Sequence, residues 1–251
     1  MNASFYAGLE HILTKPRLSV YRQDGADDTT ALARYLYNIA LYRELYAPLH
    51  IFEVSLRNAL DEALCVFFGC ADWYDALPFD NGTRSKISEA KNKITRNGKS
   101  VTHDRMIAKL TLGFWTLLIT TRYSRSKFQS NVIKRCFKNC PARSRSIKNL
   151  RETLNKMRLL RNRVSHYECI VHWKDLSAQY GQLLECTRWI DGTARILANG
   201  TDNFADVHAE GVKPVRRTCE RMLELKAHEW RDHHAGVQHG IASVGKRQRL
   251  A

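Results

Sequence analysis

The 251-residue sequence is poor in the residues that a β-rich fold needs. It has 13 Gly and 5 Pro, whereas a β-sandwich or barrel of this length would need many more turn residues. It also has no sustained alternation of apolar and polar residues. Because 44% of the residues are hydrophobic, the chain can still form a sizeable core. We therefore expect an all-α fold.

The sequence also lacks long apolar runs. The longest, such as residues 110–121, are too short to cross a bilayer. Residues 1–13 do not have the basic start and continuous apolar core of a secretory signal. The seven cysteines are an odd number without regular spacing, which favours free thiols in a reducing compartment. We expect a cytoplasmic protein without membrane contact.

No metal or cofactor site is expected. Cys136 and Cys140 lie four residues apart on a predicted helix, but a zinc site would need two more ligands, so packing is the favoured interpretation. Several histidines have no evident partner and are interpreted as surface or packing residues: His103, His172, His233 and His234.

Acidic residues are scarce in one long part of the chain. The whole sequence has 40 Lys and Arg against 25 Asp and Glu, a formal charge of +15. Residues 84–163 contain 22 of the basic residues and only three acidic ones. Charge concentrated in this way attracts polyanions, although a solvated surface is the simpler alternative. We expect contact with RNA. Whether the basic surface also binds DNA is left open by the sequence.

Helical periodicity and cap signals divide the chain into a main domain, residues 1–200, and a C-terminal extension, residues 201–251. The extension is expected to be partly helical with a mobile basic tail. Pro48 is expected in the first turn of a helix that follows a separate one. The helices predicted are 1–14, 31–46, 49–68, 83–96, 124–140, 146–165, 173–197 and 213–230. Residues 104–121 are expected to be helical with a packed helix junction at residues 113–115.

One short stretch, residues 159–168, carries the residues for a chemical hypothesis. Internal cleavage of RNA requires a proton to leave the 2′-hydroxyl, a stabilised phosphorane and a proton for the leaving 5′-oxygen. Histidine can transfer protons near neutral pH, and the arginine fork matches phosphate oxygens. Arg161 and His166 together would supply this chemistry without a metal.

The geometry imposes a condition. On an unbroken helix Arg161 and His166 would lie about 140° apart, so Arg161 must reach around or the helix must end near Ser165. Asn162 shares a face with His166 and could hold the imidazole by a hydrogen bond. The alternative is an ordinary helix end, where Arg and His complement the free carbonyls.

Three stretches, in order, resemble the Abi-like (abortive infection) branch of the HEPN superfamily. Residues 160–168 (LRNRVSHYE) resemble its signature, residues 42–60 its early helix with a Glu-x-x-x-Arg-Asn element, and residues 112–118 its Gly-Phe-Trp helix. The resemblance covers roughly residues 30–195. It implies a HEPN-like helical bundle with extra helices.

The resemblance also implies a metal-independent endoribonuclease. Such enzymes are dimers whose two motifs face each other, leave a 2′,3′-cyclic phosphate, and often act in phage defence or as toxins, with an antitoxin or another defence protein as a possible partner. On this chain it makes Arg161 and His166 the catalytic pair, with Asn162 beside them. Glu53 and Arg57 would line or orient the site, and a Glu facing Arg161 would fix the position of the guanidinium. The alternative is that Glu53 and Arg57 pair with each other on a helix surface.

The sequence departs from the family at two positions. Tyr167 stands where relatives often have a second His, and Cys169 where Pro commonly follows. Tyr167 could stack on a base or lie in the core. Arg158 and Arg163 are interpreted as RNA-phosphate contacts or surface charges. Trp115 is expected in the core rather than as a base platform.

Two other functions remain open. The chain could be a non-catalytic RNA- or DNA-binding module that uses the same basic surface. It could also be a scaffold whose charge serves an acidic protein partner.

Overall fold

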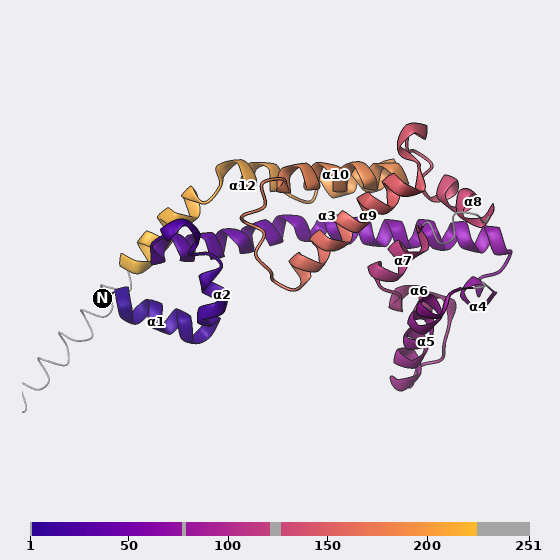
Figure 1. The fold of residues 1–251 in the computed structure, drawn as a ribbon, viewed down its shortest axis with the longest axis horizontal. Helices are drawn as coiled ribbons and strands as arrows, with labels where there is room; N and C mark the ends of the chain where they lie inside the picture. Colours follow the sequence, from indigo (N-terminus) through magenta and orange to yellow (C-terminus); the bar gives the residue numbers. More distant parts are fainter. Residues whose placement is uncertain (1, 77–78, 121–126, 225–251) are drawn as a thin grey trace, which may run out of the picture. The chain divides into compact units, whose positions relative to one another are not determined.

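A computed structural model describes residues 2–76, 79–120 and 127–224 (Figure 1), and these residues form helices and no strands. The all-α expectation is confirmed. No helix in these ranges is long and apolar enough to cross a membrane. The basic tail expected from Arg231 onward and the end of the last predicted helix lie outside the described residues.

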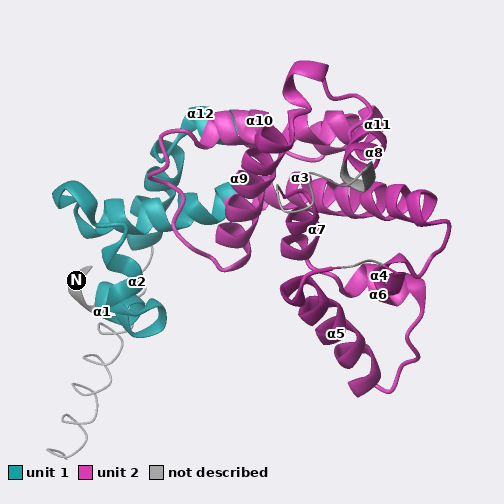
Figure 2. Cartoon of the chain, turned by 45° about the vertical axis from the view of Figure 1, so that its right-hand side comes forward, with its two compact units in different colours: residues 1–41, 206–251 teal, residues 42–205 magenta. Residues whose placement is uncertain are grey.

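The chain forms two compact units (Figure 2). Unit 1 contains residues 1–41 and 206–251, and unit 2 contains residues 42–205. This division differs from the expected boundary at residue 200, because the N-terminal segment groups with the C-terminal extension. The core of unit 1 shows why: Tyr6 and Leu32 pack with Cys219, Val212 and Val215.

Unit 1 contains short helices and the start of a long one. α1 (Asn2–Leu13) is followed by α2 (Lys15–Ser19), with a proline in its first turn, and by the 3-10 helix η1 (Gln23–Gly25). The expected connector over residues 15–28 is therefore largely helical. Helix α12 (Phe204–Glu210) runs across the boundary between the units, and residues 213–224 are helical within unit 1.

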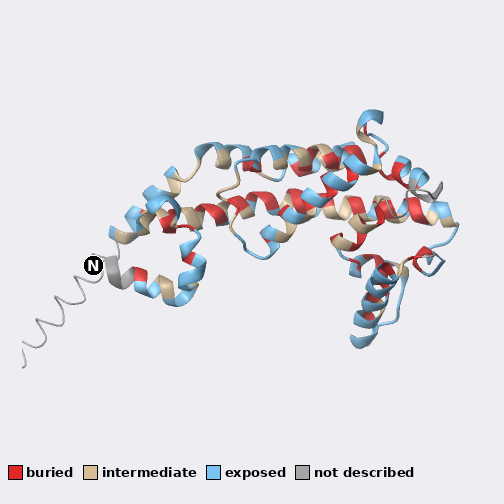
Figure 3. Ribbon diagram, viewed as in Figure 1, coloured by how far each residue is buried: buried red, intermediate tan, exposed pale blue. Residues whose placement is uncertain are grey.

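Helix α3 (Asp28–Phe68) supplies residues to both units and corrects the sequence analysis. Two helices were expected, with a break before Pro48, but the helix is continuous through Pro48. An interior proline costs about 3 kcal/mol. Burial of each large apolar side chain contributes about 1.5–3 kcal/mol, so the buried stripe beside Pro48 outweighs that cost. This stripe, visible in Figure 3, contains Leu45, Leu49, Phe52, Leu56, Leu60 and Leu64.

Aromatic side chains fill the space between α3 and the next helices of unit 2. α4 (Trp73–Ala76) places Trp73 in contact with Phe79 and with Phe114 and Trp115 of α7 (Leu112–Leu118). Trp115 is fully buried, which confirms its expected place in the core. α5 (Asn81–Arg96) and α6 (His103–Lys109) complete this part of the unit.

Helix α9 (Ile147–Ser165) begins and ends as predicted. The Ser146 hydroxyl accepts from the Asn149 backbone N–H at 3.2 Å and caps the start. The helical spacing of the apolar residues predicts a buried face containing Leu150, Leu154, Met157 and either Leu159 or Leu160. Leu150, Leu154, Met157 and Leu160 are fully buried, whereas Leu159 is 46% exposed. They hold α9 against the rest of unit 2.

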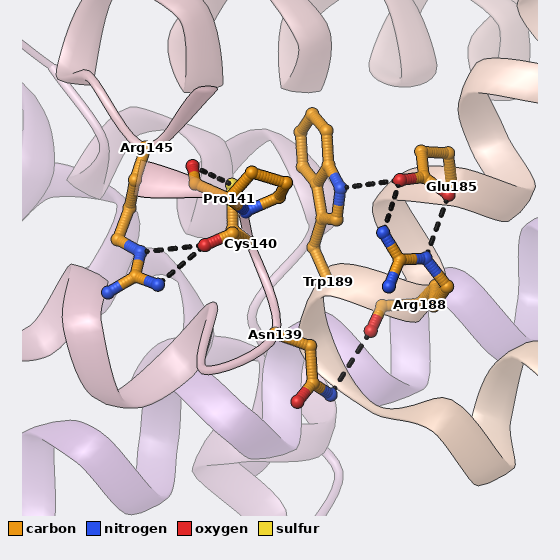
Figure 4. Close-up of polar contacts among 7 residues, drawn as sticks. All are labelled: Asn139, Cys140, Pro141, Arg145, Glu185, Arg188 and Trp189. Atoms are coloured by element: carbon orange, nitrogen blue, oxygen red, sulfur yellow. Dashed lines mark hydrogen bonds and ion pairs between the residues drawn. The ribbon is translucent and has the colours of Figure 1, made fainter. Parts of the chain in front are cut away.

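The segment between α8 (Lys127–Cys136) and α9 is anchored to α10 (Leu176–Ile190), as Figure 4 shows. The Asn139 side chain donates to the carbonyl of Arg188 at 3.2 Å, and Arg145 donates to the carbonyl of Cys140 across the 3-10 helix η3 (Ala142–Ser144). Cys136 and Cys140 are both buried and free, which confirms their packing role.

The predicted helix 173–197 is two helices, α10 and α11 (Gly192–Asn199). Asp191 separates them, because its carboxylate accepts from the backbone N–H groups of Thr193 at 2.7 Å and Ala194 at 3.2 Å. The side chain thus competes with the continuing helix and starts a new one.

Candidate functional site

The site begins with an ion pair between α9 and α3. Arg161 Nε donates to Glu53 Oε2 at 2.9 Å, and Nη2 lies 3.5 Å from Oε1. Both side chains are partly exposed, at 36% and 23%. A guanidinium carries five N–H donors, so three remain without a partner in the described part of the chain. The carboxylate therefore holds the guanidinium while leaving a fork for an anionic ligand.

Helix α9 ends one residue before His166, which satisfies the geometric condition set by the sequence. The Glu168 backbone N–H donates to the Arg163 carbonyl at 2.9 Å, and the Tyr167 N–H to the Val164 carbonyl at 3.3 Å. This pair of bonds is the Schellman motif, in which the chain reverses after the helix. His166 occupies the C-cap and its side chain is exposed.

Tyr167 takes the left-handed position of this turn, with φ of 57°. Glycine normally occupies such a position, and a bulky side chain there stores strain of about 1–2 kcal/mol. The side chain is 68% exposed, so the core interpretation of Tyr167 is wrong. Its strain and exposure make Tyr167 a candidate for a functional position beside the motif.

Other contacts brace the turn. Arg163 pairs with Glu168 at 2.6 Å, and its guanidinium carbon lies 5.7 Å from the Trp173 ring centroid. The Tyr42 hydroxyl donates to the carbonyl of Glu168. Arg163 therefore braces the turn through Glu168 and Trp173, and its side chain is still 46% exposed.

Asn162 is linked to His166 differently from the expectation. The His166 backbone N–H donates to the Asn162 backbone carbonyl at 2.9 Å. Among the residues that the structure describes, the Asn162 amide makes no hydrogen bond to the imidazole, and the side chains of Arg161 and His166 are not bonded directly. Arg57 bonds to its neighbour Asn58 at 3.3 Å, while Glu53 pairs with Arg161 instead of Arg57.

One face of α3 extends the site beyond the predicted residues. Two side chains on this face reach α9 and its terminal turn: Tyr42 bonds to Glu168, and Glu53 bonds to Arg161. Tyr46 and His50 lie between these two anchors within about an 80° arc of the helix. Both are exposed and their rings stack, 6.3 Å apart and 8° from parallel.

His50 was missed by the sequence reasoning. Its helical spacing from Tyr42, Tyr46 and Glu53 is the signal that would have found it, because all four residues share one face. This second imidazole lies one helical turn before Glu53 on α3. We name this set, Tyr42, Tyr46, His50, Glu53 and Arg57, the α3 site face.

A basic pocket lies along the preceding turns of α9. It has a volume of about 610 Å³ and is open to solvent. Four cationic side chains line it: Lys86 of α5, and Lys148, Arg151 and Arg158 of α9. Glu152 is the one acid among its lining residues. The pocket therefore suits an anion, and its α9 residues lead along one helix face towards Asn162.

Of the expected RNA contacts, Arg158 is the one placed in this pocket. Its guanidinium also donates to Asn155 Oδ1 at 2.8 Å, which orients it. Lys86, Lys148 and Arg151 were not singled out by sequence reasoning. The excess of basic residues over positions 84–163 is evident from the sequence, but the packing of α5, α7 and α9 decides which of these side chains line one pocket.

Known proteins provide no further guide to the site. No protein-family model matches the chain, and neither curated proteins nor solved structures match it.

Proposed function

We propose that the protein is a metal-independent endoribonuclease of the HEPN type. The observation that supports this most is the Arg161–Glu53 pair beside the turn that exposes His166. A held guanidinium and an exposed imidazole are the two groups that internal transesterification of RNA requires.

In this proposal His166 takes the proton of the 2′-hydroxyl, which then attacks the adjacent phosphorus. The free N–H groups of Arg161 donate to the phosphorane oxygens as negative charge develops on them. A second imidazole returns a proton to the leaving 5′-oxygen, so the products are a 2′,3′-cyclic phosphate and a 5′-hydroxyl. His50, or His166 of a second copy, is available for that step.

The basic pocket supports RNA as the substrate. Its four cations lie on the α5 and α9 surface whose α9 residues share a helix face with Asn162, and they would hold phosphates of a bound RNA. The exposed rings of Tyr46 and Tyr167, at 69% and 68%, offer faces for unpaired bases or for a second copy.

A homodimer with the site at its interface follows from the resemblance and from the small number of catalytic groups that one chain supplies. One Arg161 and one His166 per chain would be doubled by a two-fold axis through the motif. A role in phage defence or as a toxin, with an antitoxin or another defence protein as partner, is proposed on the resemblance alone.

The test is cleavage of total RNA and of tRNA in buffer with EDTA. His166→Ala should lower the cleavage rate about 10²–10⁴-fold while keeping helix content and RNA affinity. His11→Ala is the matched control, because His11 is exposed and lies in unit 1. The fragments should carry 2′,3′-cyclic phosphates, and the wild type should sediment as a dimer.

Equal cleavage by wild type and His166→Ala would exclude this assignment. Salt-sensitive binding of several RNAs without turnover would instead favour the second candidate, a non-catalytic nucleic-acid-binding module, for which the basic pocket is the supporting observation.

A further inference from the structure

A second cluster of reactive side chains lies in unit 2, further along α3 than Glu53. Asp61 and Cys65, one helical turn apart, face His103 at the start of α6. The His103 Nε2 lies 2.9 Å from Asp61 Oδ2, and the Cys65 Sγ lies 3.8 Å from Asp61 Oδ1. One ligand atom from each residue lies within 4.8 Å of the other two.

These separations fit a tetrahedral metal ion. With bonds of about 2.0–2.3 Å, a tetrahedral zinc site places its nitrogen and oxygen ligands about 3.4 Å apart and its sulfur and oxygen ligands about 3.6 Å apart. The His103 nitrogen lies 2.9 Å from Asp61 Oδ2, about half an ångström short of the nitrogen–oxygen separation, and the Cys65 sulfur lies 3.8 Å from the other oxygen, Oδ1. An ion would replace the His103–Asp61 hydrogen bond, and a rotation of the carboxylate would bring one of its oxygens to face both other ligands.

The carboxylate is also oriented from outside the cluster. The indole N–H of Trp73 donates to Asp61 Oδ1 at 2.8 Å, and Trp73 is fully buried. Metal-binding carboxylates are commonly held by such a partner, which fixes their direction. The hydrogen bonds of the cluster are still incomplete, because His103 Nδ1 is buried and has no partner among the described residues.

The chain around Asp61 and Cys65 is acidic. Residues 58–83 contain five acidic residues and no Lys or Arg, although Asp75 pairs with Lys91 and α6 carries Arg105 and Lys109 after His103. Within the described ranges, the ion-pair partner of Asp61 is His103. A divalent ion would balance this carboxylate.

We propose that Asp61, Cys65 and His103 bind a zinc ion that joins α3 to α6, with water as the fourth ligand. A thiolate, an imidazole and a carboxylate are the donors that Zn²⁺ accepts, whereas Mg²⁺ and Ca²⁺ prefer oxygen alone. The site does not depend on the proposed ribonuclease activity and uses none of its residues.

Zinc binding should release a proton. A bound dication holds a cysteine ligand as the thiolate, so the thiol proton leaves when the ion binds. The affinity for Zn²⁺ should therefore rise with pH, and about one proton should leave per ion bound.

The test is titration of the full chain, stripped with EDTA and dialysed, with Zn²⁺ against a chromophoric chelator. Because the sequence has ten His and seven Cys, the variants and not the stoichiometry identify the site. Cys65→Ser and His103→Ala should each weaken the tightest binding at least tenfold, while Trp73→Phe should weaken it about 10–100-fold. Cys70→Ser, which removes a nearby exposed thiol, should keep it.

Co²⁺ provides a second readout. It should give a thiolate charge-transfer band in the wild type and in Cys70→Ser but not in Cys65→Ser. Zn²⁺ should also raise the Tm of the wild type and leave that of His103→Ala unchanged, with circular dichroism confirming that the variants are helical. Unchanged Zn²⁺ affinity in Cys65→Ser and His103→Ala, or a wild type without the cobalt band, would overturn the proposal. None of these readouts involves RNA.

Discussion

Arg161 and Glu53, which are 108 residues apart in the chain, form an ion pair with Nε and Oε2 separated by 2.9 Å. The pair joins α9 to the middle of α3 at the turn that presents His166. Glu53 holds the Arg161 guanidinium but leaves one side of it available to a ligand. Glu53 is therefore a positioning residue. This relationship yields the first prediction.

Glu53→Gln should reduce RNA cleavage about 10–100-fold while leaving RNA affinity almost unchanged. The amide keeps the shape but loses the charge that fixes the Arg161 fork, and small displacements of a reacting group have effects of this size. Single-turnover cleavage rates and binding isotherms for the same RNA would separate the two effects. Glu62→Gln, which replaces another glutamate of α3, is the control and should cleave RNA at the wild-type rate. An equal loss of cleavage rate in both variants would contradict a specific role for Glu53.

His50→Ala should lower the cleavage rate by at least tenfold if its imidazole acts beside Arg161. The pH–rate profile distinguishes this from a packing effect, because loss of a proton-transfer group removes one limb of the bell-shaped curve. His50→Gln keeps polarity without the titration and should show the same flattened limb. An unaltered profile in both variants would remove His50 from the site and leave the second proton transfer to another group.

Tyr167→Gly should stabilise the protein and weaken its function. Glycine relieves the left-handed backbone at φ of 57°, so the free energy of unfolding should rise by about 1 kcal/mol. If the exposed ring stacks on a base, RNA binding should weaken by about 1–3 kcal/mol. Urea unfolding measures the first change and titration with single-stranded RNA the second. A stabilised variant with full RNA affinity would show that the ring does not touch the substrate.

Neutralising the basic pocket should weaken RNA binding in a salt-dependent manner. In the triple variant Lys148→Gln, Arg151→Gln, Arg158→Gln, the slope of log affinity against log salt should become shallower. The expected change for single-stranded RNA is about 0.7 for each phosphate that the variant no longer neutralises. The matched control is a triple change to Gln at exposed lysines elsewhere: Lys15, Lys174 and Lys213. Equally weakened binding in the two triple variants would mean that RNA affinity depends on the net charge of the protein and not on this pocket.

Asp191→Ala should destabilise the protein by about 0.5–2 kcal/mol, because the carboxylate caps the start of α11. The N–H groups of Ala194 and Thr193, with Lys138, hold the pKa of Asp191 below its ordinary value. Its contribution is therefore present above an ordinary aspartate pKa of about 4 and is lost as the pH falls through the lowered value. The difference in Tm between wild type and Asp191→Ala should shrink in that acidic range. Asp191→Asn keeps a neutral cap, so its Tm difference from Asp191→Ala should not change over the same range. A wild-type difference that does not shrink there would exclude the charge of Asp191 as its cause.

Local signals in the sequence predicted much of unit 2. The helix predicted over residues 146–165 matches α9, and the apolar spacing of Leu150, Leu154 and Met157 predicts its buried face. An end near Ser165 was one of two ways in which Arg161 and His166 could approach each other. These features depend on residues within a few turns of one another, so they can be read without tertiary information. The same reasoning failed at Pro48, where the local penalty is outweighed by burial against distant helices.

The site was only partly accessible to such reasoning. Arg161 and His166 stood out because they are close in sequence, whereas His50 and the lysines of the basic pocket acquire meaning from the packing of α3, α5 and α9. His103 was wrongly interpreted as a residue without a partner, since Asp61 lies 42 positions away on another helix. Contacts of this kind carry no periodic signal.

The sequence by itself therefore determined the helical class, the strong positive charge and the end of α9, because each follows from composition or from neighbours along one helix. The contact of Glu53 with Arg161 was expected from the family resemblance. The tertiary structure alone decided that α3 continues through Pro48 and that Asp61, Cys65 and His103 converge. The physical reason is that burial and electrostatic pairing act through space, and the chain must be packed before residues distant in sequence can exert them on one another.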